Sequence, residues 1–369
     1  MRVVHATLDG NLPRYGIGLA VVRLCGALAA RGHDVTLLAR AEGAREVAAR
    51  ALAPGVRVVG LEHVRGWWGG RRGYVAQVRR AVAPRADVVH VHTLTRLARW
   101  LVPARARRGA PLVVTAHASD ELGPAASAAG GVPGARARRH ARHVARVLAR
   151  AAEVVAPSRW MADRVAAVAG RAVHAIGLGA TEDVASGVRA HERFTVLVLG
   201  RLVVEKGVDL LLEGVARGLG DDPTATLVVA GDGPERAALE RRAAERAPGR
   251  VRFVGYAEGA ARRALLADAD VVAVPTRGDY ETFGLAALDA SAAGVALLVA
   301  GGGALPERVA AGEGRCVASG DPDAWARALR ALRDDPAGRR RMGDAGRASA
   351  RAQSWDASAA AHEALYATL

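Results

Sequence analysis

Apolar runs of three to seven residues alternate with Ala- and Arg-rich, helix-compatible segments along the first half of the chain. The segment from Gly18 carries Val21, Leu24 and Leu28 at helical spacing before it ends at Gly32. Strands that alternate with helices build a parallel sheet covered on both faces, so the pattern predicts an α/β fold. The predicted strands are residues 2–8, 35–38, 58–61, 88–91, 112–115 and 154–156.

The alternation lapses into a polar, charged stretch at residues 182–192 and then starts afresh. The second series of predicted strands is residues 194–199, 225–230, 251–254, 271–274 and 296–300. A length of 369 residues is more than twice the ~150 residues of a typical domain, so we predict domains at 1–188 and 189–352. Two doubly wound domains in tandem predict a ligand cleft at the carboxyl ends of their strands.

Composition and charge argue against several classes of function. No apolar stretch approaches the ~18 to 20 residues of a membrane span, and the N-terminus lacks a signal-peptide pattern, so a cytoplasmic location is expected. The two cysteines, Cys25 and Cys316, lie in opposite halves and suggest neither a disulfide nor a metal site. The net charge of +15 is spread over the whole chain with 4% aromatic residues, which argues against nucleic acid as a partner.

A single lysine, Lys206, stands among the many arginines, which hints that a compact ammonium is needed there. Lys206 and Arg201 lie within Gly200-Arg-Leu-Val-Val-Glu-Lys-Gly207, between a predicted strand and a helix that begins near Val208. Free amides and cations converge at such a turn and bind phosphate oxygens. A solvated basic loop is the alternative. The Walker A spacing is absent.

Two further turns follow predicted strands. Gly231 lies in Gly231-Asp-Gly-Pro234, where glycines permit a close backbone approach. Glu281 opens Glu281-Thr-Phe-Gly-Leu-Ala-Ala-Leu-Asp289, and a helix that starts near Thr282 would place free amides beside it and Asp289 two turns further on the same face. This predicts anion and hydroxyl recognition, against the alternative of an N-cap glutamate and an unrelated helix acid.

Together these segments resemble the retaining GT-B glycosyltransferases related to glycogen synthase and to bacterial mannosyl- and glucosyltransferases, glycosyltransferase family 4. The resemblance implies two Rossmann-like domains facing across a cleft, with a terminal helix at 353–369 that crosses back to the first domain. Seven motifs carry it in family order: Pro13 to Gly18, Asp87 to His92, Thr115 to His117, Gly200 to Gly207, Gly231 to Pro234, Glu281 to Asp289 and Leu305 to Glu307.

By that resemblance, Arg201 and Lys206 bind the donor diphosphate, Glu281 contacts the transferred sugar, and His117 meets the same sugar from the first domain. These four residues are the predicted catalytic set. The resemblance implies no metal and no cofactor beyond the nucleotide sugar donor. The predicted donor-binding residues are Gly16, Gly18, Gly200, Arg201, Lys206, Gly231, Phe283, Gly284, Leu285 and Asp289.

Two positions depart from the family pattern. The family carries a second glutamate where this chain has Asp289, which is one methylene shorter, so its ribose contact is in question. Ile17 separates Gly16 from Gly18, whereas the family carries adjacent glycines. A dinucleotide fingerprint is not indicated by this Gly-x-Gly, because residues 9–15 separate it from the first strand and no third glycine follows.

Other polar residues are predicted to be structural: His90 and His92, and the pair Asp268 and Asp270, which precedes a strand instead of following one. Trp67 and Trp68 either line an acceptor groove, touch a membrane or pack locally.

Four arginines, Arg138, Arg142, Arg146 and Arg150, recur at spacing four on one helical face. A solvated face is the favoured interpretation, and peripheral contact with anionic lipid or an acidic acceptor is the alternative.

The predicted function is transfer of a hexose or N-acetylhexosamine from a nucleoside diphosphate sugar to a hydroxyl of a small-molecule acceptor, as in natural-product biosynthesis. A UDP-sugar is favoured and GDP-mannose is the alternative donor. Three rivals stay open: an envelope lipid or polysaccharide transferase at the membrane surface, an epimerase or glycoside phosphorylase on the same architecture, and a non-catalytic nucleotide-sugar-binding protein. The acceptor and the oligomeric state are not indicated by the sequence.

Overall fold

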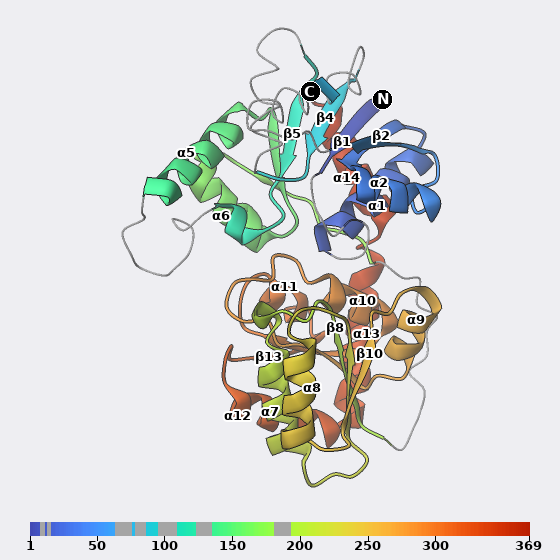
Figure 1. Ribbon diagram of the computed structural model, residues 1–369, viewed down its shortest axis with the longest axis vertical. Helices are drawn as coiled ribbons and strands as arrows, with labels where there is room; N and C mark the ends of the chain where they lie inside the picture. Colours follow the sequence, from blue (N-terminus) through green and yellow to red (C-terminus); the bar gives the residue numbers. More distant parts are fainter. Residues whose placement is uncertain are drawn as a thin grey trace. The chain divides into compact units, whose positions relative to one another are not determined.

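The computed structural model describes residues 1–7, 12, 16–62, 76–77, 86–94, 109–122, 135–180 and 193–369. The chain divides into two compact units (Figure 1). The first comprises Met1–Gly179 with Trp355–Leu369, and the second comprises Ala180–Ser354. The first division thus comes nine residues before the predicted boundary at 188.

The first unit, over its described residues, holds a seven-stranded sheet in the order β3-β2-β1-β4-β5-β6-β7, and every pair is parallel. The strands are β1 (Arg2–Ala6), β2 (Asp34–Arg40), β3 (Val56–Leu61), β4 (Val88–Val91), β5 (Leu112–Thr115), β6 (Glu153–Ala156) and β7 (His174–Ala175). The helices are α1 (Gly16–Ala30), α2 (Ala41–Ala49), the short η1 (Ser119–Leu122), α5 (Ala135–Arg150), α6 (Arg159–Ala169) and α14 (Trp355–Tyr366).

Strand alternation gives this sheet two buried faces. Val4 packs with α5 and α6, whereas Val3 packs with α1, α2 and α14. The C-terminal α14, red in Figure 1, lies against the blue α1, and Arg31 joins them through ion pairs of 2.8 Å to Asp356 and to Glu363. The C-terminal segment is therefore part of the first unit.

The second unit, over its described residues, holds a six-stranded parallel sheet in the order β10-β9-β8-β11-β12-β13. The strands are β8 (Thr195–Leu199), β9 (Thr226–Ala230), β10 (Val251–Gly255), β11 (Val271–Val274), β12 (Ala296–Ala300) and β13 (Gly314–Val317). The helices are the short η3 (Val204–Lys206), α7 (Val208–Leu219), α8 (Arg236–Arg246), α9 (Gly259–Ala267), α10 (Leu285–Ala293), α11 (Leu305–Val309), α12 (Pro322–Arg333) and α13 (Pro336–Arg351).

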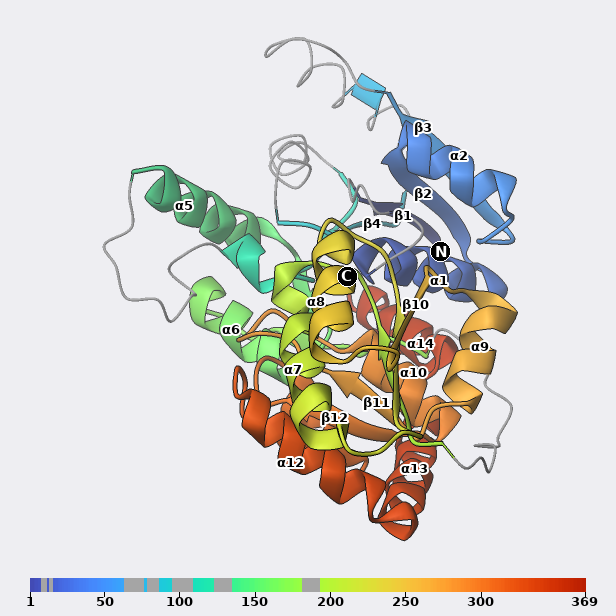
Figure 2. The ribbon, with the colours of Figure 1, turned by 60° about the horizontal axis from the view of Figure 1, so that its bottom comes forward.

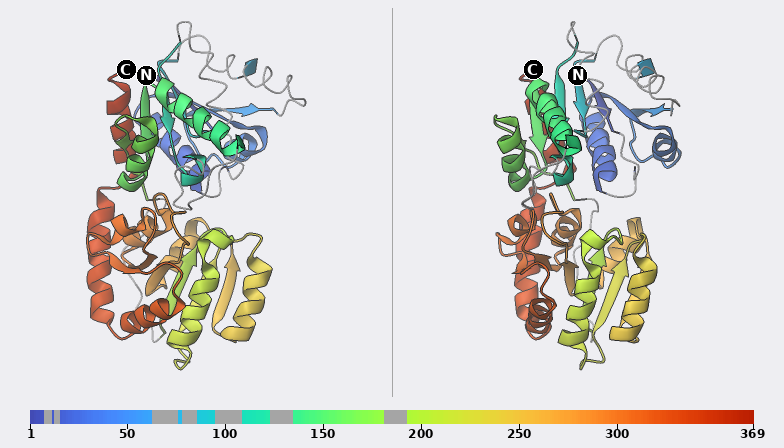
Figure 3. Two further views of the ribbon diagram at one scale, coloured as in Figure 1. Left: turned by 90° about the vertical axis from the view of Figure 1, so that its left-hand side faces the viewer. Right: turned by 60° about the vertical axis from the view of Figure 1, so that its left-hand side comes forward.

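Helices cover both faces of the second sheet. One group is α7, α8 and α12, and the other is α9, α10 and α13 (Figures 2 and 3). Trp325 of α12 is fully buried in the core, where its Cβ would collide with any side chain at Gly214 of α7. The predicted fold class, two Rossmann-like α/β units, is confirmed. Over the described residues no helix is both long enough and apolar enough to cross a bilayer.

The predicted elements agree closely with the observed ones, with three differences. Strands β7 and β13 were not predicted: β7 is exposed and two residues long, and β13, Gly-Arg-Cys-Val, is only partly buried, so neither has a continuous apolar run. The helix predicted to start near Thr282 begins instead at Leu285.

Candidate active site

The carboxyl edge of the second sheet brings two predicted glycines together. Gly200 follows β8 and Gly231 follows β9, and Gly200 N–H donates to the Ala230 carbonyl at 3.0 Å. A Cβ on Gly231 would lie 1.7 Å from the Gly200 carbonyl oxygen. Glycine is therefore needed at position 231 so that the two loops can touch, a structural role that operates beside the predicted donor contact.

Gly231→Ala is expected to lower the stability of the second unit by about 3 kcal/mol, because a methyl group would collide with backbone instead of a flexible side chain. Thermal unfolding measures this. Gly26→Ala in α1 is the control, since its Cβ would have only an ordinary contact of 3.9 Å. Equal melting of the Gly231 variant and wild type would contradict the assigned role.

Lys206 and Glu281 form an ion pair between two loops of this edge. Lys206 ends η3, after β8, while Glu281 lies in the loop between β11 and α10. The Lys206 Nζ donates to Glu281 Oε2 at 2.5 Å, and their side chains keep 24% and 16% of their surface exposed. The pair is thus accessible from outside. The structure brings together two of the residues predicted to act on the donor.

Tyr280 connects the two predicted cations. Its hydroxyl accepts a hydrogen bond of 2.8 Å from Arg201 Nη2, and the Lys206 ammonium lies 5.6 Å from the centre of its ring. Arg201 and Lys206 therefore share one aromatic support. Tyr280 was not predicted from the sequence, where its place directly before Glu281 was the available signal.

Tyr280→Phe is expected to lower kcat/KM for the donor about threefold to tenfold, the effect of one neutral hydrogen bond, because Arg201 loses its partner while the ring under Lys206 stays. Tyr280→Leu removes both contacts and should cost more. Steady-state kinetics on both variants measure the effect, with the exposed Tyr256→Phe as the matched control. A Phe variant with wild-type kinetics would remove Tyr280 from the site.

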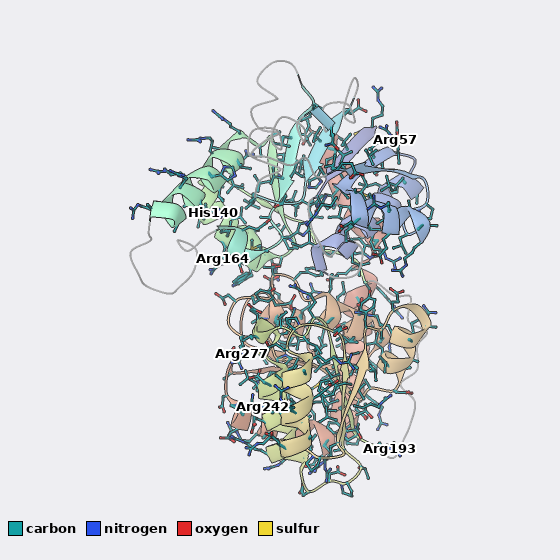
Figure 4. The ribbon with its side chains drawn as sticks, in the orientation of Figure 1. Arg57, His140, Arg164, Arg193, Arg242 and Arg277 are labelled. Carbon is teal, nitrogen blue, oxygen red and sulfur yellow. The ribbon has the colours of Figure 1, made fainter. Side chains whose placement is uncertain are left out.

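Backbone geometry fixes the turn that carries Lys206. Gly207 has a φ of +63°, and a Cβ there would lie 2.1 Å from the Pro275 carbonyl oxygen. The Arg277 amide donates to the Glu205 carbonyl at 2.8 Å, and its guanidinium bonds Asp209 of α7 at 2.6 Å. Figure 4 marks Arg277 near this turn. The loop after β11 thus holds the η3 turn in place.

The segment after Glu281 differs from the prediction. Gly284 has a φ of +87°, so the left-handed conformation ends the loop there and α10 starts only at Leu285. Glu281 accordingly precedes the helix by four residues, and Asp289 lies one turn inside it. Phe283 is buried under the guanidinium of Arg308, 4.6 Å from its ring centre, and burial lowers the pKa of Arg308.

Asp289 is fully buried and forms an ion pair with Arg262 of α9. No spacing in the sequence signals this partner. The pair is consistent with the alternative of an unrelated helix acid. The ribose contact of Asp289 stays a prediction, and Arg262 competes for the same carboxylate.

Asp289→Ala is expected to destabilise the protein by about 3 kcal/mol, because Arg262 would keep a largely buried charge without its partner. Arg262→Leu in the same chain should restore part of the loss. Denaturant unfolding measures the stability of both variants, and calorimetric titration with UDP and GDP tests whether Asp289 contacts the ribose. A tenfold or larger loss of nucleotide affinity in Asp289→Ala would support direct contact. Unchanged stability would contradict the role of the ion pair.

The remaining predicted residues lie in the first unit. Gly16, with a φ of +51°, is the first residue of α1, and Gly18 is buried in its first turn, so both belong to the helix and not to a loop. His117 follows β5, is 6% exposed, and its Nε2 lies 3.0 Å from Nδ1 of His92. Burial, with a smaller effect of His362, lowers the pKa of His117 to about 3. Pro13, Arg14, Tyr15, Trp67 and Trp68 lie outside the described residues.

Comparison with known proteins decides the family. Residues 15–179 match the Glycosyl transferase 4-like domain, and residues 180–349 match Glycosyl transferases group 1. A glycogen synthase of Mycobacterium tuberculosis is 30% identical over 372 residues, which cover 90% of this chain and 86% of that protein. The chain is a family 4 glycosyltransferase.

Two further matches agree with this family. A D-inositol 3-phosphate glycosyltransferase of Xylanimonas cellulosilytica is 31% identical over 389 residues, covering 95% of this chain and 91% of that protein. The crystal structure of HepE from Anabaena in complex with UDP matches with a TM-score of 0.81 at 19% identity over 100% of both chains, which shows the GT-B fold.

In this glycosyltransferase, Asp270 has a structural environment. It accepts a bond of 2.8 Å from the Thr195 amide and one of 3.1 Å from Arg339, at the amino end of the second sheet. That edge is opposite to the one that carries Lys206 and Glu281.

One group among the described residues has the composition of a metal site. His5, His90 and His92 are buried, and their candidate ligand atoms lie within 4.8 Å of one another. The rings of His5 and His90 stack on that of His92, at 18° and 23°, and lie at 38° to each other. Both nitrogens of His90 are already engaged, with the hydroxyl groups of Tyr366 and Thr115. The arrangement does not fit a tetrahedral metal, whose ligands point to one centre.

Helix α5 of this glycosyltransferase buries one face and exposes another. Val144, Val147 and Leu148 pack into the first core, while Arg138, Arg142, Arg146 and Arg150 are exposed. His140, marked in Figure 4, bonds the Glu121 carbonyl through Nε2 at 2.8 Å. The helix is therefore anchored with these four of its arginines exposed.

Proposed function

We propose that this glycosyltransferase moves a hexose or N-acetylhexosamine from a nucleoside diphosphate sugar to a hydroxyl of a small-molecule acceptor. Transfer retains the anomeric configuration and needs no metal. The observation that carries the proposal is the cation pair at the carboxyl edge of the second sheet, where Arg201 and Lys206 are supported by Tyr280 and Lys206 is paired with Glu281.

The two cations suit a departing diphosphate. As the bond from the anomeric carbon to the phosphate oxygen breaks, its electron pair and negative charge move onto that oxygen. A guanidinium and an ammonium held in advance stabilise this charge more than water does, because they need no reorganisation. The ammonium of Lys206 has three N–H groups, and Glu281 takes one of them.

Retention follows from where the acceptor attacks. The carboxylate of Glu281 is bound to Lys206 and that of Asp289 to Arg262, so both are engaged as ion-pair partners. The acceptor hydroxyl then approaches from the face that the diphosphate leaves, the departing phosphate oxygen takes its proton, and the new glycosidic bond forms there. Glu281 orients the transferred sugar through its hydroxyl groups.

The product tests this chemistry. We expect the glycoside formed from an α-linked donor to be α-linked, as shown by the anomeric proton coupling in NMR, and we expect turnover to persist in EDTA. A β-linked product would overturn retention. Activity that EDTA abolishes and a divalent cation restores would overturn metal independence. A UDP-sugar is the first donor to test, and GDP-mannose is the second.

A lipid acceptor at an anionic membrane is the second candidate, favoured by the exposed arginines of α5 at spacing four. Flotation with vesicles that contain phosphatidylglycerol distinguishes a lipid acceptor from a small-molecule acceptor. The small-molecule proposal expects no binding at physiological salt. Binding that is lost when Arg142 and Arg146 are both changed to Gln would favour the lipid acceptor.

A further inference from the structure

Four histidines of the first unit line one face of its sheet, and a fifth comes from α14. The register pairs His5 of β1 with His90 of β4, and strand alternation places His92 on the same face. His117 follows β5, and His362 comes from α14. All five are buried. Buried polar groups are normally hydrogen-bonded, so each ring nitrogen in this layer needs a partner.

The rings are neutral at physiological pH. Burial lowers the pKa of His5 and of His117 to about 3, and that of His362 to about 4. Burial and the neighbouring rings keep the pKa of His90 and His92 well below the ordinary value. A neutral imidazole carries one N–H and one lone pair, so each ring has two possible tautomers.

Three of these rings form a chain. Nδ1 of His5 lies 2.8 Å from Nε2 of His92, and Nδ1 of His92 lies 3.0 Å from Nε2 of His117. Because each ring owns a single N–H, both bonds must point the same way. Either His5 donates to His92 and His92 donates to His117, or both bonds are reversed.

The far nitrogen of His5 selects the direction. Nε2 of His5 is buried, and no hydrogen-bond partner lies near it among the described residues. If His117 donates to His92 and His92 donates to His5, this nitrogen holds a buried N–H without an acceptor. If His5 donates to His92 and His92 donates to His117, which we call the forward direction, it holds only a lone pair. Orphaned donors are rare in protein interiors, so the forward direction is preferred.

We propose that His5 and His92 are positioning residues that hold His117 in the tautomer with its proton on Nδ1. In that tautomer the Nδ1 of His117 is a hydrogen-bond donor and not a base. The expected effect on turnover rests on the proposed transferase function, while the tautomer itself does not.

Nitrogen-15 NMR of the full chain, with labelled histidine, tests the tautomer directly. The His117 signals are assigned by comparison with His117→Asn. We expect Nδ1 of His117 to show the protonated type of shift and Nε2 the unprotonated type. The opposite pattern in wild type would overturn the proposal without any variant.

Variants test the chain. In His92→Phe, and in His5→Phe as a second route, His117 loses its fixed donor and should change to a mixture in which the Nε2–H form appears. Tyr366→Phe is the matched control: its hydroxyl bonds Nδ1 of His90 at 2.6 Å in the same layer but outside the chain. An unchanged His117 tautomer in a folded His92→Phe or His5→Phe would contradict the proposal.

Activity and metal binding complete the test. We expect kcat/KM for the donor to fall about tenfold in His92→Phe, the loss of one hydrogen bond, and to stay at the wild-type value in Tyr366→Phe. If the tautomer is the expected one but no sugar donor is turned over, the transferase proposal is wrong and the hydrogen-bonded chain of histidines is still supported. Stoichiometric binding of Zn²⁺ that shifts the His5 and His92 signals would overturn the hydrogen-bonded chain.

Discussion

Lys206→Ala is expected to reduce kcat/KM for the sugar donor by about 10²- to 10³-fold, the range for removing one preorganised donor from a developing anion. The alanine variant leaves the departing diphosphate with Arg201 alone and leaves Glu281 without its 2.5 Å partner. Lys206→Arg should also lose most of its activity, because a planar fork does not replace a compact ammonium between Glu281 and the ring of Tyr280.

Steady-state kinetics with thermal melts separate this effect from misfolding. The two Lys206 variants should melt near the wild-type temperature, since the pair is partly exposed and worth little to stability. Arg193→Gln, which changes an exposed cation just before β8, is the control and should keep wild-type kinetics. Wild-type turnover by Lys206→Arg would show that any cation suffices at this position.

Acidification is expected to unfold the first unit before the second. The buried histidines have folded-state pKa values below the ordinary 6.5, about 3 for His5 and His117 and about 4 for His362. Between these values and 6.5 the unfolded state binds more protons than the folded state. The stability they contribute is therefore fully present above pH 6.5 and falls as the pH drops, by about 1.4 kcal/mol per pH unit for each histidine.

Hydrogen exchange followed by mass spectrometry at pH 7 and pH 5 resolves the two units. Peptides from β1 and β4 should lose protection at pH 5 after correction for the intrinsic exchange rate. Peptides from β8 and β11 are the internal reference, because the sequence of the second unit contains one histidine, His191. Equal loss in both units, or greater protection of β1 at pH 5, would contradict the buried neutral layer.

The sequence predicted what depends on local pattern. Continuous apolar runs located the central strands of both sheets, and the lone lysine pointed to the turn that pairs with Glu281. The predicted start of α10 near Thr282 was wrong because Gly284 adopts a left-handed conformation, which a Glu-Thr-Phe-Gly sequence allows but does not require.

Hydrogen-bond and ion-pair partners that lie far apart along the chain could not be predicted from the sequence. Arg262 reaches Asp289 across 27 positions, and no periodicity links α9 to α10. His90 in a strand and His92 just past it were predicted to be structural, but their bonds to His5, His117 and Tyr366 depend on strand register and on the packing of α14. Tyr280 adjoins Glu281 in the sequence, but its bond to Arg201, 79 positions away, depends on the packing of two loops.

Release of the nucleoside diphosphate is the direct assay for the proposed sugar transfer. Wild type and Lys206→Ala are incubated with UDP-glucose, UDP-N-acetylglucosamine and GDP-mannose, with and without a mixture of sugar and polyol acceptors, and binding of UDP and GDP is titrated in parallel. We expect at least one donor to release its nucleoside diphosphate, faster with acceptor, and Lys206→Ala to lose this release. Wild type that neither binds UDP or GDP nor releases diphosphate from any donor would contradict it.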